Sequence, residues 1–151
     1  MKNVPTKTKD ISIPILSISI GIVYLWFGVL KFFPGLSPAE GLAVETIAKL
    51  TFHFLDTPKS LPLLAIWECL VGVLLILNIF RRVAIPLALV HIVLTFTPML
   101  LFPEKVFSSN PLLLTMTGQY IIKNIIIISV LLVLWKQVQG RKRATVPFQT
   151  N

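Results

Sequence analysis

Residues 11–33 read ISIPILSISIGIVYLWFGVLKFF, a run of 23 residues in which Lys31 is the only charged side chain. About 20 mostly apolar residues are enough for a helix to cross the hydrocarbon core of a bilayer. Three more apolar stretches follow, at about 61–80, 83–102 and 119–137. The sequence therefore predicts an all-α membrane protein, a single membrane domain built as a four-transmembrane-helix bundle.

The composition excludes a water-soluble globular domain and a disordered chain. Of 151 residues, 55% are hydrophobic and only 13% are charged, whereas soluble domains carry about 25% charged residues. The one cysteine, Cys69, excludes an internal disulfide and a paired-cysteine redox site. The first apolar run is too long for the core of a signal peptide and has no small-residue cleavage site close behind it, so we expect it to be retained.

Two features interrupt the spans. Pro98 lies inside the third span, where a proline removes a backbone hydrogen bond and frees the carbonyl near Leu94, so we expect a kink there. The fourth span begins between Leu112 and Gln119, because Gly118 either breaks the helix or lies inside it. A span that begins at Gln119 is short, at about 25 Å by helical rise.

The cations predict how the chain crosses the membrane. Three of them, Lys49, Lys59 and Lys105, fall on one side of the four spans. The other side, with both termini, carries nine: Lys2, Lys7, Lys9, Arg81, Arg82, Lys136, Arg141, Lys142 and Arg143. Because cytoplasmic loops are enriched in Lys and Arg, we expect both termini in the cytoplasm and, in a bacterium, the inner membrane. The net charge of +8 is then explained by topology, and no nucleic-acid partner is expected.

The segment between the first two spans predicts an amphipathic helix at about 38–55. Ser37-Pro38-Ala39-Glu40 has the pattern of a helix start, with serine as the cap. Apolar residues then follow along one side, and Glu45 and Lys49 are spaced as an i,i+4 pair. This helix either covers the outer end of the bundle as a lid or docks a partner protein. The basic segment 138–151 is expected to form a cytoplasmic tail.

Charged residues within the spans are the candidate site. Charges in hydrocarbon cost about 2.5–3.5 kcal/mol on insertion scales, and such residues mark functional sites by default. Lys31, Glu68 and Lys123 come from three spans at similar outer depth, and Asn124 adjoins Lys123. We expect Glu68 to pair with Lys31 or Lys123. The alternatives are that the pair only fixes helix register and that Lys31 reaches the membrane surface along its flexible stem.

His91, near the middle of the third span, is a candidate for proton transfer or for a hydrogen bond between helices. The other histidine, His53, lies outside the spans, so haem is not expected. The sequence holds no zinc, phosphate-loop, nucleophile-elbow or dinucleotide motif. No metal site, resident cofactor or self-contained catalytic motif is therefore predicted. Residues at the outer end that would line a pocket or form an interfacial belt are Trp26, Trp67, Tyr120 and Gln119.

Three short stretches, WFGVLKFFPGLSPAE at 26–40, Trp67-Glu68 and GQYIIKN at 118–124, resemble small four-span membrane proteins of the DoxX-like superfamily. The resemblance covers about residues 11–137. It implies a compact four-helix bundle with cytoplasmic termini and a redox role, such as quinone-linked sulfur-compound oxidation, oxidative-stress defence or service to a redox enzyme. It implies that Lys31, Glu68 and Lys123 matter, while the lack of paired cysteines speaks against thiol exchange.

Three functions remain open at this point. A redox-associated accessory subunit would bind a quinone or a similar lipophilic ligand in its outer half, and would need a redox protein partner. A non-catalytic scaffold would dock a partner through residues 38–55. A small-molecule or ion transporter has the least support, because the sequence shows no inverted repeat or pair of broken helices. All three share contact with the lipid bilayer, and the sequence does not specify an oligomeric state.

Overall fold

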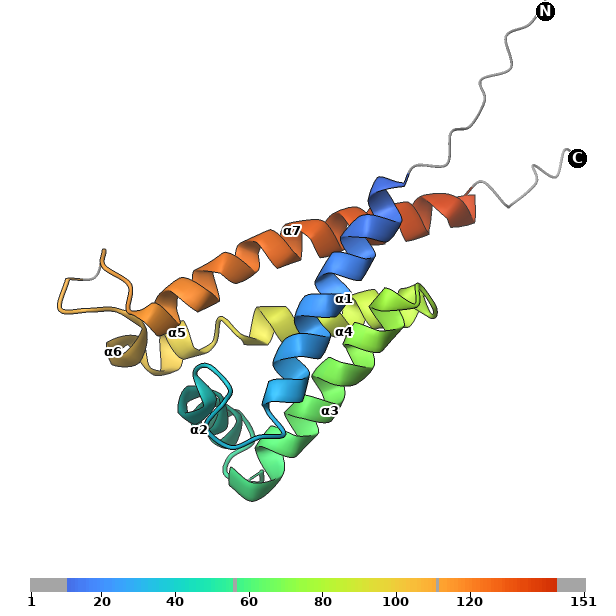
Figure 1. The fold of residues 1–151 in the computed structure, drawn as a ribbon. Helices are drawn as coiled ribbons and strands as arrows, with labels where there is room; N and C mark the ends of the chain where they lie inside the picture. Colours follow the sequence, from blue (N-terminus) through green and yellow to red (C-terminus); the bar gives the residue numbers. More distant parts are fainter. Residues whose placement is uncertain (1–10, 56, 111, 144–151) are drawn as a thin grey trace, which may run out of the picture.

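The computed structural model describes residues 11–55, 57–110 and 112–143. Within them, helices are joined by turns and short irregular segments, and Phe107 and Leu114 form an isolated bridge. Figure 1 shows the helices in order along the chain. They are α1 (Ser12–Leu30), α2 (Glu40–Leu50), α3 (Thr57–Ile76), α4 (Arg81–Leu94), α5 (Pro98–Leu101), α6 (Pro103–Val106) and α7 (Met116–Arg143).

Four segments are long and apolar enough to cross a membrane: Ser12–Leu30, Lys59–Ile76, Arg81–Leu101 and Met116–Gly140. The predicted all-α fold with four candidate membrane spans and an additional helix between the first two is therefore confirmed. Only 17% to 39% of each span is buried inside the protein. The rest presents apolar side chains outward, as helices in contact with lipid require.

The third span is disturbed at Pro98 as expected, and the helix is interrupted there rather than only kinked. α4 ends at Leu94, and α5 begins at Pro98. The carbonyl of Leu94 accepts hydrogen bonds from the backbone N–H of Thr97 at 3.1 Å and from its hydroxyl at 2.7 Å. The fourth span starts at Met116, so Gly118 lies inside α7 rather than breaking it.

α1 and α3 form a tightly packed pair. A Cβ on Gly72 of α3 would lie 2.7 Å from the backbone nitrogen of Leu25 and 2.8 Å from the carbonyl oxygen of Gly21, so only glycine allows this approach. The buried hydroxyl of Ser17 donates to the carbonyl of Leu75 at 2.9 Å, which also ties α1 to α3. Small residues that let helix backbones approach are the usual basis of membrane-helix pairing.

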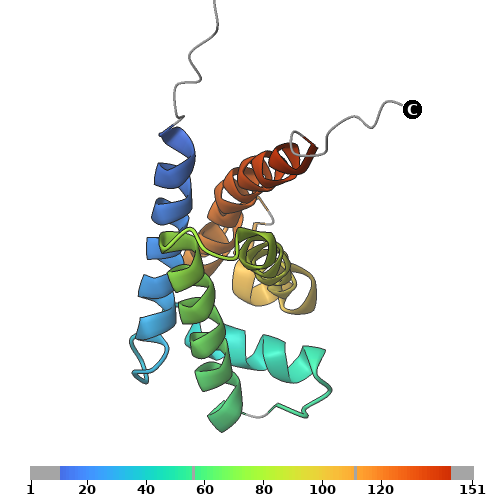
Figure 2. The ribbon, with the colours of Figure 1, turned by 90° about the vertical axis from the view of Figure 1, so that its right-hand side faces the viewer.

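The other two spans, α4 and α7, pack against each other, and Figure 2 shows this pair beside the α1–α3 pair. The main core joins the two pairs near the end where α1 begins and α7 ends, the end that also carries the α3–α4 turn (Figure 1). Its fully buried side chains are Val71, Leu75, Ala84, Ile85, Ala88, Leu131 and Leu134. We call this the terminal end of the bundle, and the opposite end, which carries α2, α5 and α6, the α2 end.

The predicted start of α2 is wrong in its details. The helix begins at Glu40, and its N-cap Ala39 has a left-handed conformation with a φ of 56° and no side-chain capping bond. The Ser37 hydroxyl instead donates to the carbonyl of Pro38 at 3.4 Å. The Glu40 carboxylate accepts from the backbone N–H of Gly35 at 2.9 Å, so it stabilises the preceding turn rather than a capping box.

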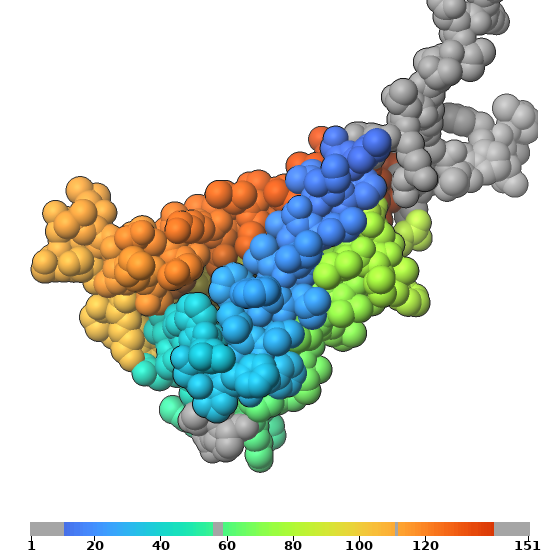
Figure 3. Space-filling view, in the orientation of Figure 1, coloured from blue at the N-terminus to red at the C-terminus, as the bar shows by residue number. Residues whose placement is uncertain are grey.

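Tertiary contacts also replace the expected pair within α2. Glu45 forms its ion pair with Lys105 of α6, and Lys49 donates to the carbonyl of Leu101 at 3.4 Å. The expected Glu45–Lys49 pair is absent because the α5–α6 region offers both side chains a partner. Figure 3 shows α2 seated between the α1–α3 pair and the α5–α6 turn. α2 ends at Leu50, short of the predicted 55.

Candidate functional site

A buried ion pair links the first two long helices at the α2 end. The Lys31 ammonium lies 2.6 Å from Oε2 of Glu68, and these side chains are 10% and 7% exposed. Lys31 directly follows the last residue of α1, and its ammonium also donates to the carbonyl of Phe27 at 3.3 Å. Gly28 lets α1 approach α3 at this level, since a Cβ there would meet Cys69 and Glu68 at 3.0 Å or less.

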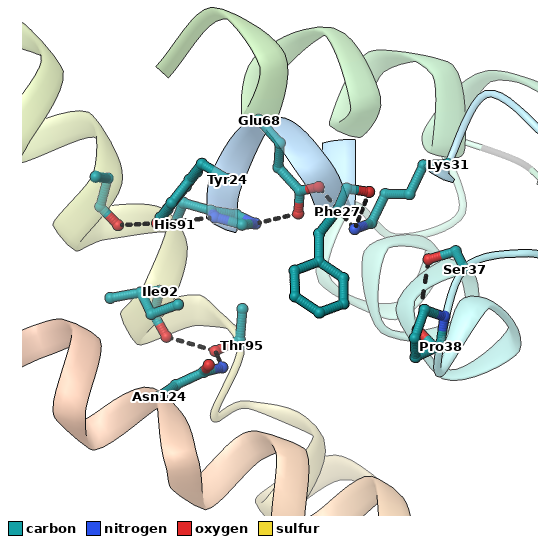
Figure 4. Close-up of polar contacts among 11 residues, drawn as sticks. Tyr24, Phe27, Lys31, Ser37, Pro38, Glu68, His91, Ile92, Thr95 and Asn124 are labelled. Atoms are coloured by element: carbon teal, nitrogen blue, oxygen red, sulfur yellow. Dashed lines mark hydrogen bonds and ion pairs between the residues drawn. The ribbon is translucent and has the colours of Figure 1, made fainter. Parts of the chain in front are cut away.

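Glu68 also contacts the third span. Its Oε1 lies 3.4 Å from Nε2 of His91 in α4. The Nδ1 of His91 lies 3.3 Å from the hydroxyl of Tyr24, which donates to the carbonyl of Ala88 at 2.9 Å. Figure 4 shows Lys31, Glu68, His91 and Tyr24 as one continuous chain of polar contacts. We call these four residues the polar cluster; it connects α1, α3 and α4.

A separate polar contact joins α4 to α7. The side-chain amide of Asn124 donates to the Thr95 hydroxyl at 2.9 Å, and that hydroxyl donates to the carbonyl of Ile92 at 2.6 Å (Figure 4). Thr95 lies in the break between α4 and α5. The irregular backbone caused by Pro98 therefore lies beside the polar face of α7.

A cavity of about 510 Å³ separates the two helix pairs toward the α2 end. Its volume falls within the usual range for small-molecule sites. The polar cluster, Thr95 and Asn124 lie on its walls. Most of the remaining lining is apolar and comes from α1, α2, α3, α4 and α7, as shown by Val23, Phe27, Leu42, Ile47, Leu64, Ile92, Ile121 and Ile127. The apolar side of α2 thus covers the cavity, which accounts for its amphipathic pattern as a lid.

The structure brings most of the predicted site residues to this cavity but divides them. Lys31, Glu68 and His91 lie on one wall, and Tyr120, Lys123 and Asn124 on the α7 wall. Lys123 does not pair with Glu68. Its ammonium lies 5.4 Å from the centre of the Tyr120 ring.

Trp26, Trp67 and Gln119 lie outside the lining and are exposed on the surface of the bundle. Successive residues of a helix are rotated by about 100°, so Trp67 points away from the face that carries its neighbour Glu68. Trp26, five positions before Lys31, is rotated by about 140° from it for the same reason. Trp26 is 66% exposed, which suits a side chain in contact with lipid or the interface.

Three residues were not among the predicted site residues: Tyr24, Phe27 and Thr95. Phe27 precedes Lys31 by four positions, and Tyr24 precedes Phe27 by three. Thr95 follows His91 by four positions. Residues at these spacings share a helix face. Helical spacing around each intramembrane charge is therefore the signal in the sequence that points to them.

The arrangement places hydrogen-bond donors, a carboxylate and an imidazole where they can bind a polar group and hold a proton. Within the described residues, no group of three or more His, Cys, Asp or Glu side chains could hold a metal ion. Cys69 is a free, partly buried thiol. Comparisons with protein-family models, curated proteins and solved structures find no significant match to this chain.

Proposed function

We propose that this integral membrane protein binds a lipophilic ligand with oxygen acceptors on its head, such as a quinone, in the cavity at the α2 end. The observation that carries the proposal is the combination of a mostly apolar cavity with three polar side chains on one wall. Glu68 and His91 lie within two of the membrane spans, and Lys31 directly follows the end of a third. Lys31 supplies a cationic hydrogen-bond donor, and the apolar lining accommodates rings or chains. A polar head that meets a donor there avoids the cost of an unsatisfied group in hydrocarbon.

We further propose that the protein is an accessory subunit of a redox enzyme and a member of the DoxX-like superfamily, with cytoplasmic termini and the α2 end outside. The positions of Arg81 and Arg82 at the terminal end support this orientation. The single cysteine provides no dithiol pair within the chain, and the proposal assigns the exchange of electrons with the bound quinone to a partner protein. The chain's own contribution is to bind and orient the ligand and to hold a proton between Glu68 and His91.

A titration of a short-chain quinone into the purified protein in neutral nanodiscs, followed by tryptophan fluorescence, tests the proposal. We expect saturable binding that weakens about tenfold or more in Glu68→Gln, because loss of the carboxylate releases Lys31 and His91 from their positions. Glu45→Gln is the matched control, since Glu45 pairs with Lys105 and is not part of the cavity lining. Absence of saturable binding, or equal affinities in the wild type and Glu68→Gln, refutes the quinone site.

A further inference from the structure

The charges that face the cavity do not balance. The lining contains two lysines, Lys31 and Lys123, and one acid, Glu68. Lys31 already holds Glu68 at 2.6 Å. The partner of Lys123 is the ring of Tyr120 at 5.4 Å, and no acid among the described residues forms an ion pair with it. The cavity therefore presents a cation without a counter-ion.

The polar cluster supplies no negative charge to balance Lys123, as the directions of its hydrogen bonds indicate. The hydroxyl of Tyr24 donates its proton to Ala88, so Nδ1 of His91 donates to Tyr24. In a neutral His91 the proton is then on Nδ1, and Nε2 carries a lone pair. This lone pair would face a lone pair of the ionised Glu68 at Oε1, 3.4 Å away, which is repulsive. The contact is attractive when one proton lies between them, and the cluster with Lys31 then carries a charge of +1.

Lys123 also lies at membrane depth. It follows Met116, the first residue of α7, by seven positions, or about 10 Å along the helix. An ammonium at this depth is unfavourable unless it reaches water or an anion neutralises it. Asn124, next to it in the lining, uses one amide hydrogen on Thr95 and has a second one to donate. Lys123 and Asn124 therefore each bring a hydrogen-bond donor to the α7 side of the lining.

We propose that the ligand of this cavity is a single-chain amphiphile with an anionic oxygen head, a carboxylate or phosphate, whose charge is neutralised by Lys123. This inference rests on the proposed function, that the cavity binds a lipophilic ligand, and specifies the charge of the head. The chain of the ligand lies along the apolar lining from Phe27 to Ile127. Two lining residues, Val23 of α1 and Tyr120 of α7, are 37% and 46% exposed, so the lining continues to the surface of the bundle, where the chain of the ligand would meet lipid.

Four probes that share one C16 chain and differ in head charge test the inference in nanodiscs of neutral phosphatidylcholine. They are hexadecanoate, hexadecyl phosphate, hexadecanol and hexadecyltrimethylammonium. We expect at least one anionic probe to bind about tenfold or more tightly than hexadecanol, and the cationic probe to bind most weakly. The order of the two anions identifies the source, a fatty acid or a lipid phosphate.

Lys123→Met is expected to remove the preference for the anion while hexadecanol binding stays the same. This variant should fold, because Lys123 is exposed and its ammonium forms no ion pair within the described residues. Lys105→Met is the matched control, since Lys105 lies outside the lining and should leave the preference intact.

Equal binding of hexadecanol and both anions, or a preference that survives in Lys123→Met, overturns the inference and leaves the lipophilic site standing. Failure of the quinone and of every C16 probe to bind overturns the proposed function and the inference with it. Anion binding without quinone binding supports the inference and removes the quinone assignment.

Discussion

Substitution of Gly72 by alanine should separate α1 from α3. A Cβ at this position would lie 2.7 Å from the backbone nitrogen of Leu25, and ordinary contact begins at 3.4 Å, so the helices must move apart by about 0.7 Å. The obstructing atoms belong to the backbone, and no side chain can rotate away to relieve the contact. Overpacking costs about 1–3 kcal/mol, and the better helix propensity of alanine returns about 0.5–1 kcal/mol. We expect a net loss of about 1–2 kcal/mol, roughly a tenfold fall in the ratio of folded to unfolded protein.

Reversible unfolding in mixed detergent micelles measures this difference. Trp26 in α1 and Trp67 in α3 report separation of the pair through their fluorescence. Gly41→Ala in α2 is the control, because a Cβ there meets nothing within 4 Å. It should retain stability or gain up to about 1 kcal/mol. If Gly72→Ala proves as stable as Gly41→Ala, the close α1–α3 packing is refuted.

Two further predictions concern the contacts around the cavity. Gly118→Ala should displace α6 from α7, because its Cβ would lie 2.3 Å from the carbonyl oxygen of Val106. Trypsin should then cleave faster after Lys105. An unchanged cleavage rate would contradict the contact. Tyr24→Phe removes the hydroxyl that connects α1 to α4. Hydrogen bonds between membrane helices average about 0.6 kcal/mol and reach about 1.7 kcal/mol, so unfolding in the same micelles should show a loss in that range. If Tyr24→Phe is as stable as the wild type, the hydroxyl does not stabilise the contact between α1 and α4.

Several features of the fold follow from local sequence. Four apolar runs of sufficient length form helices, because a chain in lipid must satisfy its backbone hydrogen bonds internally. Pro98 interrupts the third span because a proline has no backbone N–H to donate to the residue four positions before it. This effect depends on the one residue alone. The helix start at Ser37 was predicted wrongly because Ala39 takes a left-handed conformation, so the helix begins only at Glu40.

The composition of the candidate site was only partly predictable. A buried carboxylate requires a partner, and this physical requirement is enough to identify Glu68 as one half of an ion pair from its position in an apolar span. The spacing Tyr24, Gly28, Lys31 likewise places these residues on one face of α1. The aromatic residues of the lining could not be chosen from their type alone, because Trp26 and Trp67 lie on the faces of their helices that point outward.

The sequence by itself determined that the chain forms four apolar helices, that Pro98 disturbs the third and that Glu68 needs a cation. Only the tertiary structure decided that this cation is Lys31, that His91 shares the carboxylate and that Lys123 stands apart across the cavity. Local pattern fixes which residues share a helix face, while contacts between helices fix the direction in which each face points. Glycines bring α1 against α3, whereas α7 packs against α4, and this pairing separates the two lysines.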